Sequence, residues 1–159
     1  LKSKSFTIQE AQKKLENYCA YQERCHQEVI QKLKSLNMIQ IAIDQIIGKL
    51  ITDNYLNETR FAQSYARGKF RIKKWGKIRI LSQLKFRGIS AWNIKKGMQE
   101  INSGEYLDTF ETLFDQIWNQ YQHLDFINCQ KKVCNRLQYR GWENELIFDA
   151  IRDKKGKNS

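Results

Sequence analysis

The chain has 159 residues, 41% of them hydrophobic, and it carries a formal net charge of +11 at pH 7. This length allows one ordinary domain or several very small units, and the apolar fraction is sufficient for a core. The sequence has no run of eighteen apolar residues and no signal-type apolar stretch after its first residues. We therefore expect a soluble, cytoplasmic protein rather than a membrane or secreted one.

Proline is absent from the sequence. Because proline breaks helices and punctuates loops, its absence beside many Gln, Lys, Leu and Ile residues favours an all-helical chain. The four cysteines lack C-x-x-C spacing and only two histidines are present. A zinc site built from Cys25, His26 and the distant cysteines is the weaker alternative to buried free thiols, so we expect no metal and no cofactor.

The first predicted helix begins near Thr7. In the stretch FTIQE, Thr7 would cap the helix, Glu10 would reach back, and Phe6 would pack onto Ala11. Two further long helices are expected, over about 57–74 and about 106–122. Each of the three long helices is followed by a pair of shorter helices.

These shorter pairs repeat in sequence. Segments 29–43, 80–94 and 133–147 align without gaps on the anchor leucines Leu33, Leu84 and Leu137. Val or Ile precedes each anchor by four residues and lies on the same helical face. Four residues after each anchor stands Asn37, Gly88 or Gly141, the residue types that end helices in the left-handed conformation. An apolar residue follows and packs back, and Ser90 is placed to cap the next helix.

The repeats predict an all-α fold of three tandem three-helix-bundle repeats. The expected units are residues 1–56, the basic unit 57–104, and 105–159. Such small units bury little surface alone, so stacking them in a row would give an elongated, curved array. We expect it to be a monomer.

Positive charge is concentrated in the middle of the chain. Residues 55–104 carry twelve basic and two acidic side chains, whereas the flanking segments carry net +2 and −1. On a helical wheel, residues 60–74 show a cationic stripe and a separate apolar side. The stripe is Arg60, Arg67, Arg71 and Lys74, and the apolar side is Phe61, Ala62, Tyr65 and Ile72.

No acidic residue lies within 60–80, so no i,i+4 ion pair offsets the repulsion along this stripe. A merely solvated face is the alternative, but uncompensated charge favours a polyanionic or acidic partner. Charge alone does not distinguish a phosphate backbone from an acidic protein surface. Trp75 is a candidate for base stacking or docking, and Gly76 with Lys77 at a helix start is a weak candidate for holding one phosphate.

The residues from Tyr55 to Ser90, YLNETRFAQSYARGKF followed by KKWGKIRILSQLKFRGIS, resemble the RecX family of bacterial recombinase regulators. The family pattern there is an acidic residue, Arg-Phe-Ala, a Tyr-containing helix, a basic segment ending in Gly, and Leu-x-x-x-Gly-Ile. A second match is YCAYQERCHQEVIQKL from Tyr18 to Leu33, where Arg24, Glu28, Lys32 and Leu33 carry the motif. Cys25 stands where Ser is common. The resemblance covers all three repeats and is specific mainly in the first two.

The resemblance implies three tandem three-helix units and a protein that binds RecA and the RecA–DNA filament. Family members restrain the recombinase, ATPase and co-protease activities of RecA, regulate DNA repair and recombination, and in many cases bind single- or double-stranded DNA. They have no catalytic residues or cofactor to transfer. The candidate filament- or nucleic-acid-binding residues are Arg60, Arg67, Arg71, Lys73, Lys74, Trp75, Lys77, Arg79, Lys85 and Arg87.

Two other readings are open at this point. A helix-turn-helix protein could act on DNA without RecA, although the segment SAWNIKKGMQEI offers little of the expected base-reading face. An enzyme is disfavoured, because the sequence contains no P-loop, dinucleotide fingerprint, metal-ligand cluster or plausible triad.

Overall fold

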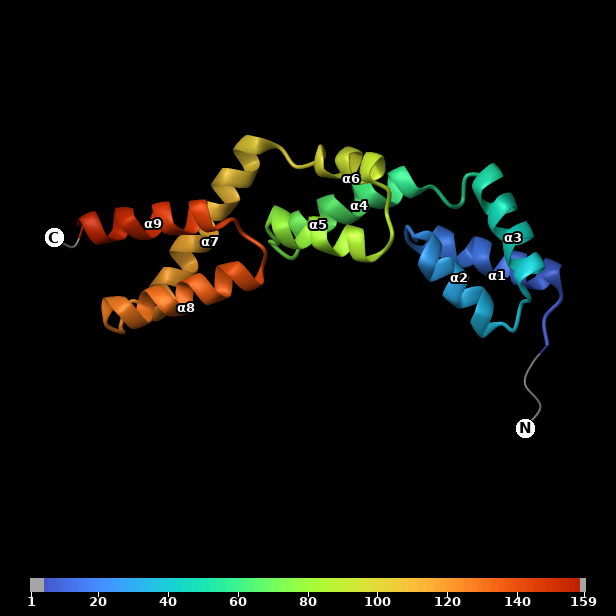
Figure 1. Cartoon of the computed structure of the whole chain (residues 1–159), viewed down its shortest axis with the longest axis horizontal. Coiled ribbons are helices and arrows are strands. Elements are labelled where there is room, and N and C mark those ends of the chain that lie inside the picture. The colour runs from blue at the N-terminus through green and yellow to red at the C-terminus, as the bar shows by residue number, and fades with distance from the viewer. Residues whose placement is uncertain (1–4, 158–159) are drawn as a thin grey trace.

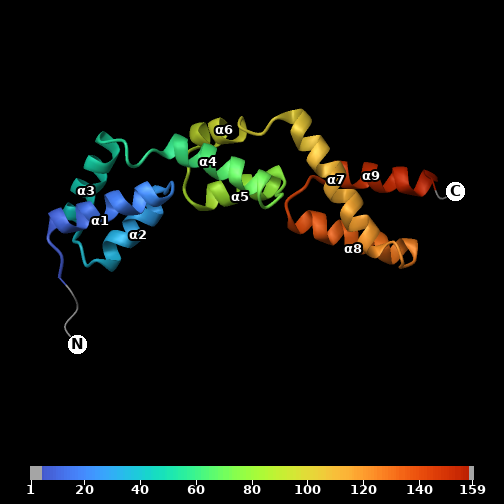
Figure 2. The same cartoon turned by 180° about the vertical axis from the view of Figure 1, so that it is seen from behind.

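The computed structural model describes residues 5–157, and within them the chain forms nine helices and no strand (Figure 1). The helices are α1 (Ile8–Tyr21), α2 (His26–Ser35), α3 (Gln40–Thr52), α4 (Glu58–Arg71), α5 (Lys77–Phe86), α6 (Ala91–Met98), α7 (Ser103–Tyr121), α8 (Phe126–Tyr139) and α9 (Asn144–Lys157). Figures 1 and 2 show these helices gathered in a row, with α1–α3 at one end, α4–α6 in the middle and α7–α9 at the other end. The predicted all-α, elongated array is confirmed. No helix in the described range is long and apolar enough to cross a membrane.

The helix starts follow the predicted capping chemistry. Thr7 Oγ1 accepts the Glu10 amide at 3.1 Å, which is the N-cap bond of a capping box, and the Thr7 hydroxyl donates to the Glu10 carboxylate at 3.2 Å. Ser90 caps α6 by accepting the Asn93 amide at 3.2 Å. Side chains of Asn57, Asn102 and Asp125 cap α4, α7 and α8 in the same way.

The helix ends in the three repeats share one geometry. Asn37, Gly88 and Gly141 have φ of 61°, 75° and 92°, the left-handed values predicted from the sequence. The apolar residue after each one donates its amide to the anchor leucine carbonyl: Met38 to Leu33 at 3.1 Å, Ile89 to Leu84 at 3.2 Å and Trp142 to Leu137 at 3.1 Å. This is the Schellman pattern, and it brings the next helix back onto the same core.

The buried apolar side chains form two cores rather than three. One core holds residues of α1–α3, including Leu15 and Leu33. The other is continuous through α4–α9, and it also receives Cys25 from the loop between α1 and α2. The second and third groups of helices therefore support one another, and we keep the division at residues 56/57 and 104/105 as a proposal for the domain organisation.

Helix α4 is shorter than the sequence predicts. It ends at Arg71 rather than near Lys74, because Ile72 is its C-cap and Lys74 adopts a left-handed φ of 58°. The assignment of Ile72 to the apolar inner side is wrong, since its side chain is 78% exposed. The prediction holds for Phe61 and Ala62, which are buried, and for Tyr65, which packs against the core. The third long helix begins at Ser103, earlier than expected, because Asn102 caps it.

Candidate functional site: the cationic middle unit

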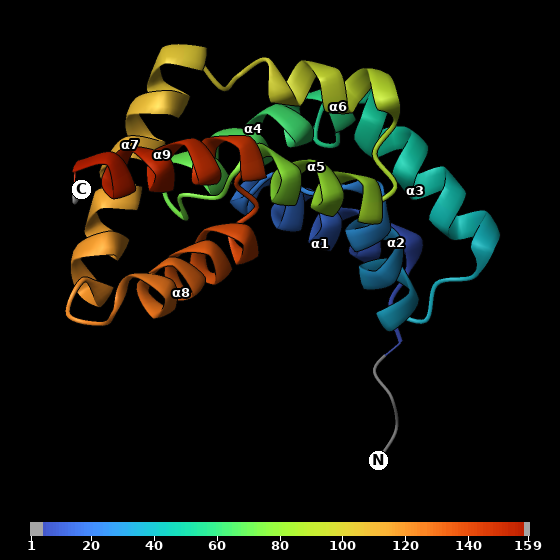
Figure 3. The ribbon, with the colours of Figure 1, turned by 60° about the vertical axis from the view of Figure 1, so that its left-hand side comes forward.

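The ten predicted residues lie on three consecutive elements of the middle unit. Arg60, Arg67 and Arg71 are on α4; Lys73, Lys74 and Trp75 are in the following turn; Lys77, Arg79 and Lys85 are on α5, and Arg87 is its C-cap. The three elements are adjacent in the ribbon shown in Figure 3. The contacts of each side chain decide which of these charges face a partner.

The arginine stripe on α4 is compensated, contrary to the prediction. Arg67 Nη1 lies 2.8 Å from a Glu100 carboxylate oxygen, and Arg71 Nε lies 3.3 Å from Glu105. Both acids come from more than thirty residues further along the chain: Glu100 lies just after α6 and Glu105 lies in the first turn of α7. The absence of local acids in residues 60–80 therefore did not mean that the charge is unpaired. These arginines tie α4 to its neighbours.

Arg60 joins the first and second units. Its guanidinium pairs with the Glu23 carboxylate and also donates to the Asn54 side chain at 3.1 Å and to the backbone carbonyls of Asn54 and Tyr55 at 3.0 and 3.2 Å. A planar guanidinium with five donors suits this arrangement, which a lysine could not reproduce. Arg60 thus fixes the chain between α3 and α4.

Trp75 is engaged inside the unit. The Arg79 guanidinium lies 4.0 Å from its ring centroid, the Lys69 ammonium lies 4.9 Å away, and Tyr65 packs edge-on. Arg79 also lies over Tyr139 at 4.7 Å and donates to the Tyr139 carbonyl. Stacking of a base on Trp75 would have to displace these cations, so the structure assigns this ring to packing within the second unit.

The N-terminus of α5 binds the third unit rather than a phosphate. The Gly76 amide donates to the Arg140 carbonyl at 2.8 Å, and the Ile78 amide donates to the Gly141 carbonyl at 3.0 Å. The Lys77 amide donates to Tyr106 Oη at 2.9 Å. These three donors are already satisfied, and the proposed phosphate site at Gly76 and Lys77 is wrong.

Tyr106 is the centre of this junction. Its hydroxyl donates to the Glu143 carboxylate at 2.6 Å, and its ring stacks on Trp142 with 4.5 Å between centroids. Burial, and then the hydrogen bond to Glu143, raises the pKa of the Tyr106 phenol far above its usual value. The Lys77 ammonium lies 4.5 Å from the centroid of the same ring. Lys77, a predicted contact residue, is therefore part of the junction.

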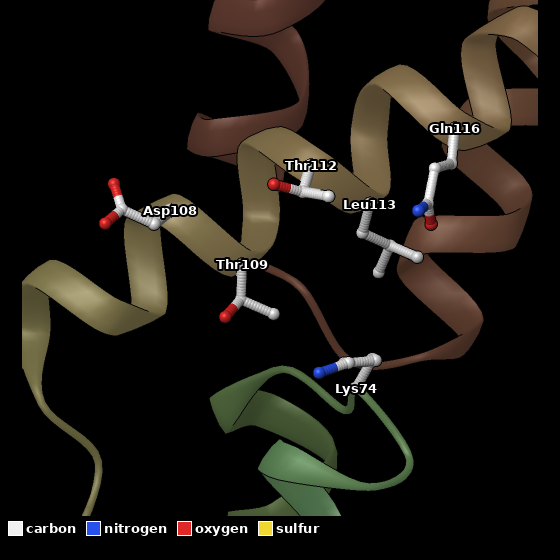
Figure 4. A pocket seen from close by; sticks show the side chains of 6 residues that line it. All are labelled: Lys74, Asp108, Thr109, Thr112, Leu113 and Gln116. Carbon is white, nitrogen blue, oxygen red and sulfur yellow. The ribbon is translucent and has the colours of Figure 1, made fainter.

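The turn between α4 and α5 is fixed by its backbone and leaves its lysines exposed. Arg140 donates to the Lys73 carbonyl at 2.9 Å, and Trp142 Nε1 donates to the Lys74 carbonyl at 3.0 Å. Figure 4 shows the Lys74 side chain reaching toward α7 from the turn. It lines a pocket of about 250 Å³ with Asp108, Thr109, Thr112, Leu113 and Gln116.

Lys73, Lys74 and Lys85 are therefore the predicted cations that the structure leaves available. All three are exposed, and no ion pair among residues 5–157 involves them. Arg87 is half-buried over Tyr65 and lines a pocket of about 330 Å³ with Glu23 and Glu28 at the junction of the first two units. The predicted cations thus divide into residues engaged inside the fold, which are the arginines and Lys77, and three accessible lysines.

The predicted set omits two exposed aromatic residues, Phe86 and Trp92, whose side chains are 77% and 62% exposed. The helical period could have identified Phe86, because it lies two residues, about 200°, from the buried anchor Leu84. Trp92 immediately follows the first residue of α6 and is bordered by the Lys96 ammonium at 5.0 Å.

Comparisons with known proteins show what the chain is similar to. Residues 57–98 match the family model described as the second three-helix domain of RecX. The regulatory protein RecX of Bacillus cytotoxicus is 26% identical over 148 residues, covering 93% of this chain and 55% of that protein. The corresponding protein of Lactobacillus gasseri is 28% identical over 130 residues, covering 82% and 48%. The chain therefore spans about half the length of these curated relatives.

Solved structures agree with this match across the whole array. The crystal structure of RecX from Lactobacillus salivarius has a TM-score of 0.78 and 28% identity, and the match covers 92% of this chain and 95% of that one. A second crystal structure, of a regulatory protein RecX, shares the fold with a TM-score of 0.77 at 20% identity, covering 91% and 74%. In sequence and in fold the chain is thus similar to the RecX regulatory proteins.

Proposed function

We propose that this chain binds the RecA recombinase and its filament on DNA and restrains the recombinase, ATPase and co-protease activities of RecA. It would act as a binding protein without chemistry of its own. The similarity to RecX proteins supports the regulatory role, because the named relatives are regulatory proteins. The observation that carries the proposal is the accessible lysine turn at Lys73 and Lys74 in the middle of an elongated three-unit array.

The array favours binding to a repeating partner. Three units in a row can contact more than one protomer of a filament, and several weak contacts then add through multivalency. The lysine turn would contribute attraction to filament DNA or to an acidic recombinase surface. Its backbone is held by Arg140 and Trp142, so little order has to be gained on binding.

The test is ATP hydrolysis by RecA on single-stranded DNA with sub-stoichiometric amounts of this chain added. We expect hydrolysis to fall and filaments to shorten. A double variant Lys73→Gln and Lys74→Gln should inhibit less than a matched pair from the first unit, Lys13→Gln and Lys34→Gln, which removes the same charge from exposed positions. Unchanged hydrolysis and unchanged filament length with the wild-type chain would overturn the proposal.

Action on DNA without RecA is the rival function. It would require α6 to read base edges, yet Asn93, the amide side chain within α6, already donates to Glu58 at 2.5 Å and accepts from Thr59 at 2.6 Å. A sequence-specific footprint on duplex DNA in the absence of RecA would favour this rival.

A further inference from the structure

An apolar groove runs between α5 and α6 on the middle unit. Its volume is about 510 Å³. The groove is lined by Leu81, Lys85, Ile89, Ala91, Ile94, Lys95 and Met98. Apart from the two lysines, every lining side chain is apolar. Ile78, which is 53% exposed, lies one turn before Leu81 and extends the same face of α5.

Two exposed aromatic residues stand next in sequence to residues that line the groove. Phe86 follows Lys85 on α5, and Trp92 follows Ala91 on α6. No carboxylate lines the groove.

The three repeats show that this charge is particular to the middle unit. At the aligned positions, Lys85 and Lys95 correspond to Lys34 and Asp44 in the first repeat, and to Gln138 and Phe148 in the third. The common helical framework therefore does not require two cations here. A pair of lysines flanking an apolar trough selects a partner with carboxylates on either side of an apolar stripe.

We propose that the α5–α6 groove binds a short, acidic, amphipathic helix presented by the recombinase. A trough between two helices accepts a third helix whose apolar residues recur at i, i+3 or i+4, and i+7. Those residues would contact Leu81, Ile94 and Met98, while carboxylates on the flanks would face Lys85 and Lys95. This inference rests on the proposed function for the identity of the partner, and on the groove itself for the chemistry.

The first test uses the whole chain and a synthetic helical peptide of about fourteen residues, with Leu on the i, i+4, i+7 stripe and Glu elsewhere. Its affinity is measured by fluorescence anisotropy beside that of an analogue carrying Gln in place of Glu. We expect the acidic peptide to bind about tenfold more tightly, and the variant with Lys85→Gln and Lys95→Gln to lose that preference. Lys34→Gln in the first repeat should leave it unchanged.

Ala91→Glu is the sharper variant. Ala91 is exposed at the start of α6, whose first turn has no acidic residue, so a glutamate there suits the helix dipole and preserves the fold. It also places a negative charge in the groove, and Ala91→Gln controls for its size. We expect the Glu variant to bind the acidic peptide about tenfold more weakly than the Gln variant does. Equal binding by the two variants, or equal binding of the two peptides, would overturn the groove proposal.

ATP hydrolysis by RecA separates this inference from the proposed function. If both are correct, Ala91→Glu inhibits hydrolysis less than Ala91→Gln does. Equal inhibition by the two variants, with the peptide preference intact, overturns the assignment of the helix to the recombinase and leaves the proposed function standing. If the wild-type chain fails to inhibit at all, the proposed function falls and the recombinase assignment falls with it, whereas the peptide results still decide what the groove binds.

Discussion

At the scale of single residues, the contact between Gly76 and Gly141 determines how the second and third units meet. A Cβ on Gly76 would lie 2.3 Å from the Gly141 carbonyl oxygen, and a Cβ on Gly141 would lie 2.3 Å from Arg79 Cβ. Gly141 also has φ of 92°, which L side chains rarely adopt. The two backbones can approach closely enough for their hydrogen bonds only because neither residue carries a side chain.

Gly141→Ala should therefore destabilise the protein by at least about 2 kcal/mol, through the clash with Arg79 and the strained backbone. Urea unfolding followed by circular dichroism measures the change. Gly68→Ala is the control, because a Cβ there meets nothing within 4 Å and Gly68 lies within α4. That substitution should stabilise by about 0.5–1 kcal/mol. A Gly141→Ala variant as stable as the wild type would show that the junction is looser than described.

Ionisation of Tyr106 makes the free energy of unfolding depend on pH. Its pKa is raised by burial and by Glu143, so in the folded protein the phenol stays protonated above the ordinary tyrosine pKa of about 10. Below about pH 10 the phenol is neutral in both states and its full contribution is present. Above that pH the unfolded chain ionises and gains stability, so the free energy of unfolding falls.

The matching variant is Tyr106→Phe. It should lower the free energy of unfolding by about 1–3 kcal/mol at pH 7, because the Lys77 amide and the Glu143 carboxylate lose their partner. The difference between wild type and variant should shrink as the pH rises above about 10, as measured by urea unfolding at several pH values. A difference that stays constant would contradict the raised pKa of Tyr106.

At the scale of elements, local sequence predicted helix starts and helix ends well. Thr7 and Ser90 cap their helices, and Asn37, Gly88 and Gly141 end theirs in the left-handed conformation, because these effects depend on neighbours within a few residues. The predicted continuation of α4 to Lys74 failed because the turn after Arg71 is held by the carbonyl contacts of Arg140 and Trp142. Those partners lie more than sixty residues away and leave no local signal.

The candidate site likewise has features that the local sequence predicts and features that depend on tertiary contacts. The sequence identified the cationic unit, but it could not show which charges are paired, because Glu100 and Glu105 approach Arg67 and Arg71 only in the folded chain. The expectation that Trp75 offers a ring for stacking met the same difficulty, since Lys69 and Arg79 cover it through tertiary packing. The helical period alone would have predicted that the Phe86 side chain is exposed.

The turn lysines and the paired arginines should behave differently toward single-stranded DNA. Each phosphate contact contributes about 0.7 to the slope of log affinity against log salt concentration. Lys73→Gln with Lys74→Gln should therefore reduce this slope by about 1.4 without changing stability, as measured by fluorescence anisotropy over a range of salt concentrations.

Two variants provide the comparison. Lys13→Gln with Lys34→Gln, in the first unit, should leave the slope nearly unchanged. Arg67→Gln should mainly lower stability, because it leaves Glu100 without its partner. If the slope falls equally for the turn pair and for the first-unit pair, net charge rather than the turn governs DNA binding.

At the scale of the whole molecule, the two cores predict that the first unit is more independent of the second than the second unit is of the third. The core of α1–α3 is separate, whereas α4–α9 share one core that extends across the junction at Tyr106 and Trp142. The first unit is joined to the second mainly through Arg60, Cys25 and the short connection after α3. Curvature of the array should therefore vary at this connection more than between the second and third units.

Leu15→Ala tests this division. Leu15 is fully buried in the first core, so the substitution should cost about 2–5 kcal/mol there. Hydrogen exchange followed by mass spectrometry should then show loss of protection in α1–α3 with little change in α4–α9. Leu84→Ala, in the shared core, should instead reduce protection on both sides of the junction. Equal loss over all nine helices after Leu15→Ala would mean that the molecule unfolds as one unit.

We propose that this array binds a recombinase filament through its middle unit. The decisive experiment is an electron-microscopy reconstruction of RecA filaments on single-stranded DNA, saturated with this chain. We predict density for the three units along the filament, with the Lys73–Lys74 turn and the α5–α6 groove facing filament DNA or protein. Filaments that carry no such density, or density in which α4–α6 face solvent, would contradict the account.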